Sequence, residues 1–340
     1  MKNKKYLWYG VIYGFLLTAF TAYILMDTFV ITRAYTPMPS NNSSQNTNSD
    51  RNSISLPESS TDGTEAQTAV IAENAYTDDD NTGPDRNNTS SAESNADENV
   101  APTALITDVT YKDDNISISL TEYKQYETNI HVADIQLSSS EYLKTAFAHG
   151  VYGQNVTEKT SETAQSNNAI LAINGDYYGV RETGYVLRNG ILYRSSSSGK
   201  EILTIYKDGS FSMFTEGEVS AEQLLSDGAE QILCFGPALV THGEISVSDR
   251  SKVKNPRTAI GIIDDLHYVF VVTDGRVDDS EGLTYHELAE FMHSLNVKEA
   301  YNLDGGGSSM MYFNGSIINH LAGGENSRGR SVSDIVYIGY

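Results

Sequence analysis

The sequence contains a single cysteine among 340 residues, and it has far fewer basic than acidic side chains. One cysteine cannot pair within the chain, which excludes a disulfide framework and a zinc site built from cysteines. The 23 lysines and arginines stand against 45 aspartates and glutamates and leave a net charge of −22. Most of such a surface would repel a phosphate polyanion, so the composition argues against a protein that binds nucleic acid or an anionic membrane surface.

Several catalytic motifs are missing as well. Neither a Walker loop nor the G-x-S-x-G elbow of serine hydrolases occurs in the chain. His286 and Glu287 begin like a zincin helix, but the second histidine of that motif is absent and His293 has the wrong spacing. Because the seven histidines show no paired ligand spacing, we predict no metal site and no cofactor.

Residues 7–26 form a run of twenty positions without a charge. A helix of this length rises about 30 Å, enough to cross the hydrocarbon core of a bilayer. Lys2, Lys4 and Lys5 precede the run, so the positive-inside rule places the N-terminus in the cytoplasm and the C-terminal part outside the cell. We predict that residues 1–33 are a cytoplasmic tip and a single-pass signal-anchor in the cell membrane.

The alternative for this segment is a cleaved signal peptide. The apolar region of a signal peptide usually spans about 7–15 residues and ends in small residues. Here the run is longer and ends in Ile24, Leu25, Met26 and Asp27, which is a poor cleavage site. The pattern therefore favours an uncleaved anchor.

Asn, Ser, Thr and Asp dominate residues 34–103, and long apolar runs are absent there. Such a segment cannot bury enough apolar area to offset its ordering entropy, so we predict a disordered linker. As a flexible spacer it would hold the following domain about 45 Å from the membrane. It could provide clearance through a surface layer, or it could be a linker without a specific role.

From residue 104 to 340 the pattern is that of a folded, strand-rich domain. Ile116, Ile118 and Leu120 alternate as in a half-buried strand, and residues 169–173 form a short, wholly apolar strand. A second strand spans residues 130–137, where a break in the apolar phase suggests a bulge. Cys234 lies in an apolar run and is predicted to be inert core.

Turn and cap residues complete the fold prediction. Tight hairpins that require positive φ are expected at three dipeptides: Asn189-Gly190, Asp208-Gly209 and Asn314-Gly315. Ser220 with Gln223 and Thr284 with Glu287 are typical of helix N-termini. The second helix lies between two apolar strands, which predicts a β-α-β passage. The fold class is therefore α+β, a mixed, strand-rich sheet domain with few helices, preceded by one transmembrane helix and a disordered linker.

Two segments in the first half of this domain could carry chemistry. Asn174, Asp176 and Tyr177 follow an apolar strand in a glycine-containing turn, where they could face a cleft and where the tyrosine could stack on a sugar ring. A β-turn with packed tyrosines explains the same residues equally well. Arg257 stands directly before an apolar strand and could hold a phosphate, although an arginine there is more often a surface ion pair.

Two further segments follow in the second half. Asp274 and Arg276 end a buried strand, in what could also be a simple turn. Three consecutive glycines are costly in backbone entropy unless the chain needs unusual φ and ψ or the close approach of a ligand, and their N–H groups could form an anion nest. These glycines lie between a carboxylate and two hydroxyls, and this combination favours a functional site over a purely structural turn. The residues are Asp304, Gly305, Gly306, Gly307, Ser308 and Ser309.

These segments, in this order, resemble the phosphodiester glycosidase family. The resemblance rests on NGDYY, NPRTAIG, TDGR, the helix GLTYHELAEFM, NLDGGGSSMMYFNG, and Arg330 with Val332 and Ser333 before a final strand. It covers residues 165–340, with a strand-rich lead-in from residue 104. Asp176 departs from the family pattern, in which many members have a second glycine followed by two aromatic residues. The anchor and spacer look like those of bacterial members attached to exopolysaccharide systems at the cell surface.

The resemblance implies hydrolysis at the anomeric carbon of a sugar-1-phosphodiester, of the N-acetylglucosamine-1-phosphate type. It makes Asp304 the first choice for the carboxylate that acts at this carbon, as nucleophile or as base, and Asp274 the second. Nothing in the sequence supports a metal on these two carboxylates. The implied substrate-binding residues are Asn174, Asp176, Tyr177, Arg257, Arg276, Asn302, Gly305, Gly306, Gly307, Ser308, Ser309 and Arg330.

The expected substrate is a carbohydrate or sugar-phosphate polymer at the cell surface, which fits poorly with the acidic surface unless the cleft is locally basic. We therefore expect Arg257, Arg276 and Arg330 to cluster at the mouth of this cleft. Two other functions stay open. The same cleft could serve a non-catalytic glycan-binding module, or the chain could be an accessory protein of exopolysaccharide biosynthesis or export.

Overall fold

The computed structural model describes residues 3–29, 31–34, 105–106, 109–247, 251–324 and 327–340. The predicted linker, 34–103, lies outside these ranges except for Ala34. Within the described ranges, strands follow one another from residue 105 to residue 338. The predicted domain boundaries stay predictions.

Helix α1 (Asn3–Phe29) contains the apolar run of the N-terminus. Its large side chains, such as Trp8 and Phe15, are exposed. Within the part of the chain that the structure describes, no helix combines the length and the apolar character that crossing a membrane requires. The anchor therefore stays a prediction. After α1, residues 31–34 meet the domain: β1 (Arg33–Ala34) pairs with β7 (Gly153–Gln154) in a two-stranded antiparallel sheet.

The domain is built on a sheet of nine strands in the order β15-β14-β18-β16-β17-β5-β4-β3-β2. Their bounds are β2 Leu105–Ile106, β3 Thr110–Lys112, β4 Ile116–Gln125, β5 Thr128–Leu137, β14 Ala238–Thr241, β15 Glu244–Ile245, β16 Thr258–Asp264, β17 His267–Thr273 and β18 Glu299–Asn302. Both β17 and β18 pair antiparallel with β16, so they run parallel to each other. Helix α4 (Tyr285–Ser294) connects them, which confirms the predicted β-α-β passage.

Two sheets of five strands complete the domain. One has the order β20-β19-β8-β21-β6 and the other the order β10-β9-β13-β11-β12. The first contains β6 Leu143–Phe147, β8 Leu171–Asn174, β19 Met311–Phe313, β20 Ser316–Ile317 and β21 Asp334–Ile338. The second contains β9 Val186–Arg188, β10 Ile191–Arg194, β11 Glu201–Tyr206, β12 Phe211–Thr215 and β13 Ala229–Leu233. The remaining helices are α2 Thr160–Ser166 and α3 Ala221–Ser226, with 3-10 turns at Ser140–Tyr142, Ala148–Gly150, Tyr178–Val180 and Gly306–Ser308.

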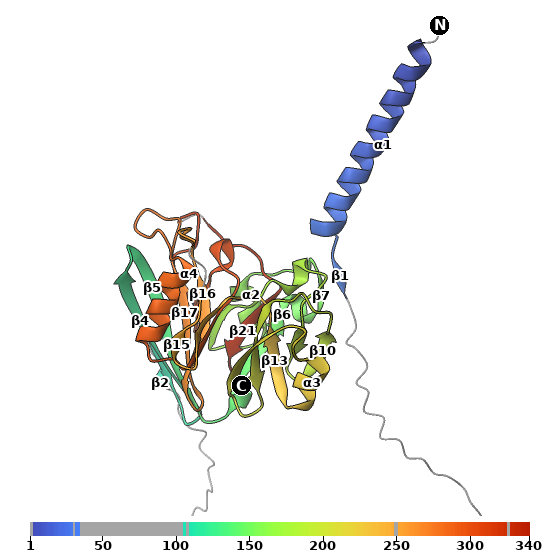
Figure 1. Cartoon of the computed structure of the whole chain (residues 1–340). Helices are drawn as coiled ribbons and strands as arrows, with labels where there is room; N and C mark the ends of the chain where they lie inside the picture. The colour runs from blue at the N-terminus through green and yellow to red at the C-terminus, as the bar shows by residue number, and fades with distance from the viewer. Residues whose placement is uncertain (1–2, 30, 35–104, 107–108, 248–250, 325–326) are drawn as a thin grey trace, which may run out of the picture. The chain divides into compact units, whose positions relative to one another are not determined.

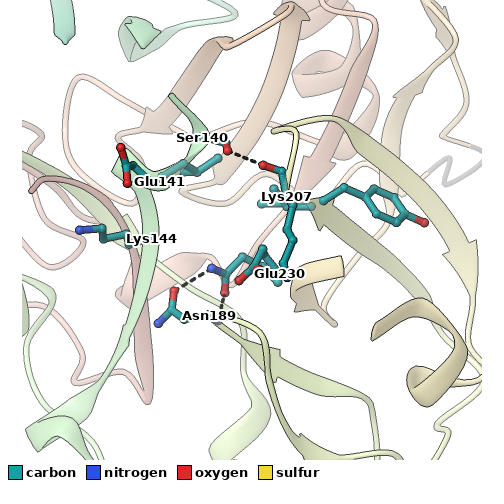
Figure 2. Close-up of a pocket in the computed structure, with 10 residues that line it drawn as sticks. Ser140, Glu141, Lys144, Asn189, Lys207 and Glu230 are labelled. Atoms are coloured by element: carbon teal, nitrogen blue, oxygen red, sulfur yellow. Dashed lines mark hydrogen bonds and ion pairs between the residues drawn. The ribbon is translucent and has the colours of Figure 1, made fainter. Parts of the chain in front are cut away.

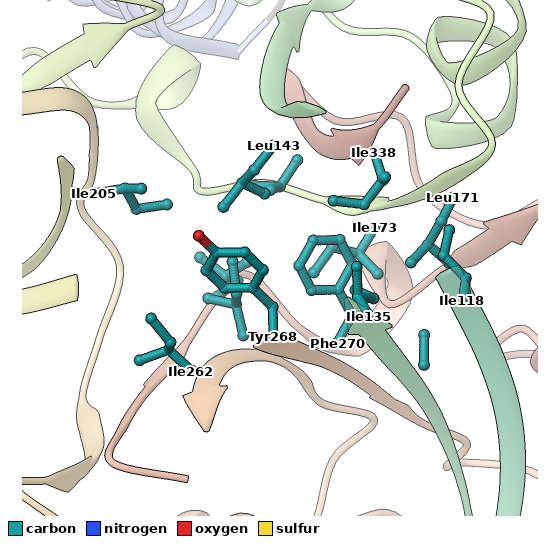
Figure 3. Packing of buried hydrophobic residues seen from close by; sticks show 14 of the residues in the cluster. Ile118, Ile135, Leu143, Leu171, Ile173, Ile205, Ile262, Tyr268, Phe270 and Ile338 are labelled. Carbon is teal, nitrogen blue, oxygen red and sulfur yellow. The ribbon is translucent and has the colours of Figure 1, made fainter. Parts of the chain in front are cut away.

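The main core lies between the nine-stranded sheet and the two smaller sheets, and Figure 3 shows part of it. Tyr268 and Phe270 of β17 lie in this core together with Leu171 and Ile173 of β8. On its other face, the nine-stranded sheet packs against α4, which lies over the sheet in Figure 1. Each fully buried large apolar side chain contributes about 1.5–3 kcal/mol, so this double-sided burial dominates the stability of the domain.

The predicted turns and caps are confirmed. Asn189 and Gly190 join β9 to β10 with φ angles of 50° and 73°, as a tight hairpin requires. The other two dipeptides likewise join β11 to β12 and β19 to β20. Thr284 accepts a hydrogen bond from the Glu287 N–H at the start of α4, and Glu287 reaches back to the Thr284 N–H at 2.8 Å.

The predicted bulge in residues 130–137 is wrong. Strand β5 pairs residue by residue with β4 and β17 along its whole length. The apolar phase changes because β5 is buried on both faces. Ile130 and Val132 face the core under α4, whereas Ile135 and Leu137 face the main core. A strand in the middle of a covered sheet does not need to alternate.

Candidate functional site

Asp304 lies where two sheets meet. It follows β18 in the nine-stranded sheet, and its N–H donates to the carbonyl of Gly175, which follows β8 in the neighbouring sheet, at 3.2 Å. A pocket of 170 Å³ opens at this junction, lined by Asn155, Thr157, Asp176, Tyr177, Val180, Asp304, Arg330, Ser331, Val332 and Ser333. Three residues of the predicted site besides Asp304 therefore line one cavity.

Arg330 is the basic partner of Asp304. Its Nη2 donates to the two carboxylate oxygens at 3.1 and 2.9 Å and to the Gly305 carbonyl at 3.1 Å, while Nε donates to Ser308 Oγ at 2.7 Å. The Arg330 side chain is 48% exposed, whereas that of Asp304 is 8% exposed. The guanidinium can therefore reach a ligand in the pocket while it stays on the carboxylate.

The environment of Asp304 changes its acidity. Burial raises the pKa of the Asp304 carboxyl above its ordinary value, because the charged form loses its hydration. Hydrogen bonds from Ser308 and the Gly305 N–H, together with the charge of Arg330, oppose this effect but do not cancel it. A carboxyl with a raised pKa in a pocket is a typical candidate for acid–base or nucleophilic chemistry.

The triglycine turn brings the backbone close to its neighbours. Gly306 has a φ of +64°, and a Cβ at Gly305 would lie 2.8 Å from the Pro256 carbonyl oxygen, so both positions require glycine. The predicted anion nest is not open, because the Gly306 N–H donates to Pro256 at 2.8 Å and the Gly305 N–H to Asp304 at 2.9 Å. The turn thus positions Asp304, Ser308 and Arg330 instead of presenting these two amides to a ligand.

The side-chain amide of Asn174 holds the triglycine turn through hydrogen bonds. Its Nδ2 donates to the Asp304 carbonyl at 2.6 Å, and its Oδ1 accepts from Thr258 Oγ1 at 2.8 Å and from the Met310 N–H at 3.3 Å. The Thr258 hydroxyl also contacts Ser309 Oγ at 3.2 Å. Because Asn174 is fully buried, these contacts indicate a positioning role for its amide.

Asn302 is also buried, and its Nδ2 donates to the Gly236 carbonyl at 2.8 Å. Its Oδ1 has no hydrogen-bond partner among the described residues. The predicted contacts of Asn174 and Asn302 with sugar hydroxyls stay predictions.

Asp274 lies at the same edge of the nine-stranded sheet but is fully buried. Its Oδ1 is 3.1 Å from His131 Nε2 and accepts from the His320 N–H at 2.8 Å, and its Oδ2 is 2.8 Å from His320 Nδ1. Burial opposes ionisation, but the hydrogen bonds and charge of His131, with the bonds from His320, hold the pKa of Asp274 below its ordinary value. The Asp274 carboxylate therefore has no direct contact with solvent, and a histidine side chain lies between them.

The three predicted phosphate-binding arginines contact different partners. The Arg257 guanidinium lies 3.8 Å from the centre of the Tyr285 ring, and its Nε donates to the Leu283 carbonyl at 2.9 Å. Arg276 bonds to Asn255 Oδ1, and its guanidinium lies 3.5 Å from where a Gly306 Cβ would be. Only Arg330 among these three lines the pocket at Asp304.

Tyr177 and Asp176 line the pocket in different ways. Two guanidinium groups lie near the Tyr177 ring, with Arg330 5.7 Å and Arg181 5.8 Å from its centre. The Asp176 carboxylate is buried and accepts from Arg188 Nη2 and the Cys234 N–H, at 2.9 and 2.8 Å. The predicted contact of Tyr177 with a sugar stays a prediction, whereas these contacts of Asp176 tie it to the protein.

Some residues around the site could not be found from the sequence. His131, His320, Arg188 and Asp334 stand in no motif, and each acts through a partner that is more than 40 residues away. Cys234 was placed correctly: it is buried, and burial raises the pKa of its thiol to about 12. In the described ranges, no group of three or more His, Cys, Asp or Glu side chains is arranged to hold a metal ion.

A larger pocket of 480 Å³ lies elsewhere, between β6, β11 and β13. Figure 2 shows that some of its polar groups are joined to one another: Ser140 to the Lys207 carbonyl, and Gln231 Nε2 to Asn189 Oδ1 at 2.7 Å. None of the predicted site residues lines it. We therefore assign the site by its chemistry to the smaller pocket at Asp304.

Part of the chain is similar to known proteins. The family model described as phosphodiester glycosidase matches residues 167–339, about half of the chain. A prophage-derived protein of Bacillus subtilis (strain 168), YomE, is 30% identical over 202 residues, covering 56% of this chain and 31% of that protein. The N-acetylglucosamine-1-phosphodiester alpha-N-acetylglucosaminidase of Bos taurus is 28% identical over 183 residues, covering 47% of this chain and 34% of the bovine protein.

The fold is also found in solved structures. The catalytic domain of the zebrafish N-acetylglucosamine-1-phosphodiester alpha-N-acetylglucosaminidase, auto-inhibited by its pro-peptide, superposes with a TM-score of 0.54 at 21% identity and covers 66% of this chain and 83% of that one. A hypothetical protein from Synechocystis gives a TM-score of 0.52 at 12% identity, with coverages of 66% and 62%. The chain spans about a third of the length of the curated relatives it matches, so the match concerns one domain of those proteins.

Proposed function

The chain belongs to the phosphodiester glycosidase family, and from that premise we propose that it hydrolyses a sugar-1-phosphodiester in a surface polysaccharide or glycoconjugate. The sugar is of the N-acetylglucosamine-1-phosphate type, by similarity to the bovine relative. One observation carries the proposal: a buried carboxylate, Asp304, faces a pocket together with the half-exposed guanidinium of Arg330.

The geometry supports a different role for each of the pocket residues Arg330, Asp304 and Tyr177. Arg330 contacts the phosphate, because its fork of donors suits phosphate oxygens. Asp304 acts at the anomeric carbon, as nucleophile or as base toward water, while an oxocarbenium-like transition state develops. Tyr177 offers its ring to the sugar. The pocket is smaller than the roughly 300–1,000 Å³ of drug-sized ligand sites, which favours one terminal sugar over a longer chain segment.

Release of free N-acetylglucosamine from UDP-N-acetylglucosamine and from a methyl phosphodiester of the same sugar tests the activity. We expect turnover by the full chain and a loss of about 10²–10⁴-fold in Asp304→Asn, as for removal of an acid–base group. The matched control is Asp264→Asn, which makes the same chemical change at an exposed carboxylate paired with Lys298.

Unchanged turnover in Asp304→Asn, with folding intact by circular dichroism, would rule out the assigned role. Binding of the sugar phosphodiester without any turnover by the unchanged protein would overturn the hydrolase. It would favour the glycan-binding alternative instead.

The cellular location belongs to the proposal as well. We place the domain outside the cell, with the N-terminus in the cytoplasm and residues 7–26 in the membrane, because this run is uncharged and follows three lysines. In a membrane preparation, the full chain should stay in the pellet after carbonate extraction, whereas a chain that begins at residue 31 should not. Recovery of both chains in the supernatant would overturn the anchor and leave the hydrolase untouched.

A further inference from the structure

A second group of titratable side chains lies at the same edge of the nine-stranded sheet as Asp304. The Asp274 carboxylate is fully buried between two histidines, with His131 Nε2 at 3.1 Å and His320 Nδ1 at 2.8 Å. The His320 N–H also donates to it at 2.8 Å. Two hydrogen bonds from one residue to one carboxylate fix both the position and the orientation of the His320 ring.

The two histidines differ in their access to solvent. The His131 side chain is 5% exposed, whereas that of His320 is 69% exposed. Since Nδ1 of His320 faces Asp274, Nε2 is the nitrogen that a ligand can reach. A buried carboxylate that orients an accessible imidazole is the arrangement that many hydrolases use for proton transfer.

The strand order places the backbone of Asp274, the partner of this imidazole, two strand spacings from that of Asp304. Asp274 follows β17 and Asp304 follows β18, and β16 alone lies between these two parallel strands. Neighbouring strands are about 4.8 Å apart, so the two backbones are separated by roughly 10 Å. The Arg276 guanidinium lies between the two segments, against Gly306.

The segment that carries His320 is itself bound to the glycine turn. The side chain of Asn319 donates to the Ser309 carbonyl at 3.2 Å and accepts from the Met311 N–H at 2.8 Å. The backbone of residue 320 is thus held on the turn that positions Asp304.

On the premise of the proposed hydrolysis, we propose that His320 is the proton donor of the reaction and that Asp274 positions it. Nε2–H binds a phosphate oxygen of the substrate. Water forms the new bond to the anomeric carbon and loses a proton to Asp304. The bond from this carbon to the phosphate oxygen breaks, its electron pair stays on that oxygen, and the His320 proton joins it. The products are the free sugar and a phosphomonoester, and both groups return to their starting states by exchange with solvent.

The surroundings of His320 favour its protonated form. The hydrogen bond to Asp274 and then its charge raise the pKa of His320 above its ordinary value, with smaller contributions from Asp279 and Glu122, while partial burial opposes them. His131 faces the same carboxylate, and Lys124 lies 3.8 Å from Asp279. A donor that must carry a proton loses function as the pH rises through its pKa, so the rate should fall on the alkaline side.

The test compares His320→Gln and Asp274→Asn with the full unchanged chain, with sugar release measured from pH 5 to pH 9. The matched control is His286→Gln, which alters another exposed histidine that faces a carboxylate, Glu290 at 3.5 Å. We expect His320→Gln to lower kcat by about 10²-fold or more with a small change in KM, and to remove the alkaline fall. In Asp274→Asn the alkaline fall should move to lower pH, and His286→Gln should match the unchanged chain.

A glycosyl fluoride of the same sugar separates chemistry from folding, because its leaving group has no phosphate to protonate. His320→Gln should hydrolyse it at nearly the unchanged rate. Equal losses on both substrates would overturn the proton-donor role and leave a structural one.

Two further outcomes distinguish the proposals. No turnover of any substrate by the unchanged chain would overturn the proposed function and this inference with it. Turnover by the unchanged chain with an unaltered pH profile in His320→Gln would overturn this inference alone.

Discussion

At the residue scale, the contact between Arg330 and Asp304 joins side chains 26 positions apart and sets the charge of the pocket. Burial raises the pKa of Asp304, and Arg330 is one of the groups that oppose the rise. In Arg330→Gln the opposing charge is gone, so the pKa of Asp304 should rise further. Because Asp304 must be ionised to act, the acid limb of the pH–rate profile should move to higher pH.

The same substitution also removes a contact with the phosphate. A charge-assisted hydrogen bond contributes about 1.5–3 kcal/mol, so KM should rise by about 10- to 150-fold. Arg330→Lys is the matched variant, since it keeps the charge but cannot reproduce the fork of donors. A higher KM with an acid limb that stays in place would show that Arg330 binds phosphate without tuning Asp304.

Other residues show how far side-chain chemistry can be predicted from sequence. Asp304 and Arg330 were predicted for one site, and they meet. Arg257 was predicted for the same mouth, but its guanidinium packs on Tyr285. Residue type and position at a strand end predict where the backbone of a residue lies. The direction of its side chain depends on neighbours from remote segments of the chain. His320 was missed for the same reason, because its partner Asp274 is 46 residues away.

At the element scale, features that depend on adjacent residues were predictable. The three hairpins follow from dipeptides that tolerate positive φ, and the start of α4 follows from a side chain that accepts an N–H three residues later. Such signals need no knowledge of the rest of the fold. The β-α-β passage through α4 belongs with them, because an amphipathic helix between two apolar strands has few alternative packings.

Elements whose surroundings are set by distant segments were not predictable. The phase change in β5 indicated a bulge, because the sequence does not say that both faces of this strand are covered. The pairing of β1 with β7 was also missed. It joins Arg33 to Gln154, and a Cβ at Gly153 would lie 2.1 Å from the Arg33 carbonyl oxygen, so the contact depends on a glycine far along the chain.

At the scale of the whole molecule, one buried arginine ties the two five-stranded sheets together beneath the site. Arg188 of β9 donates from Nη2 to Asp176 at 2.9 Å and to Asp334 of β21 at 2.7 Å, and from Nε to Asp334 at 2.9 Å. All three side chains are almost completely buried. Burial still raises the pKa of Asp334 despite the charge of Arg188, which shows how strongly this environment disfavours charge.

Arg188→Met should therefore lower the free energy of unfolding by about 3–5 kcal/mol, because two carboxylates would lose their partner inside the protein. Because the opposing charge of Arg188 would be gone, the pKa of Asp334 in the folded state would rise further above that in the unfolded state. Folding would then take up protons, so the loss should be larger at pH 8 than at pH 5. Urea unfolding of the full chain at the two pH values measures both effects.

Two controls make this test specific. Lys298→Met breaks an exposed ion pair with Asp264 and should cost less than about 1 kcal/mol at either pH. Adding Asp334→Asn to Arg188→Met should cost less than the sum of the two single changes, because the second removes a charge that the first left unpaired. A loss below about 1 kcal/mol in Arg188→Met, or additive losses in the double variant, would contradict a coupled network, since a buried pair that loses one partner typically costs several times more.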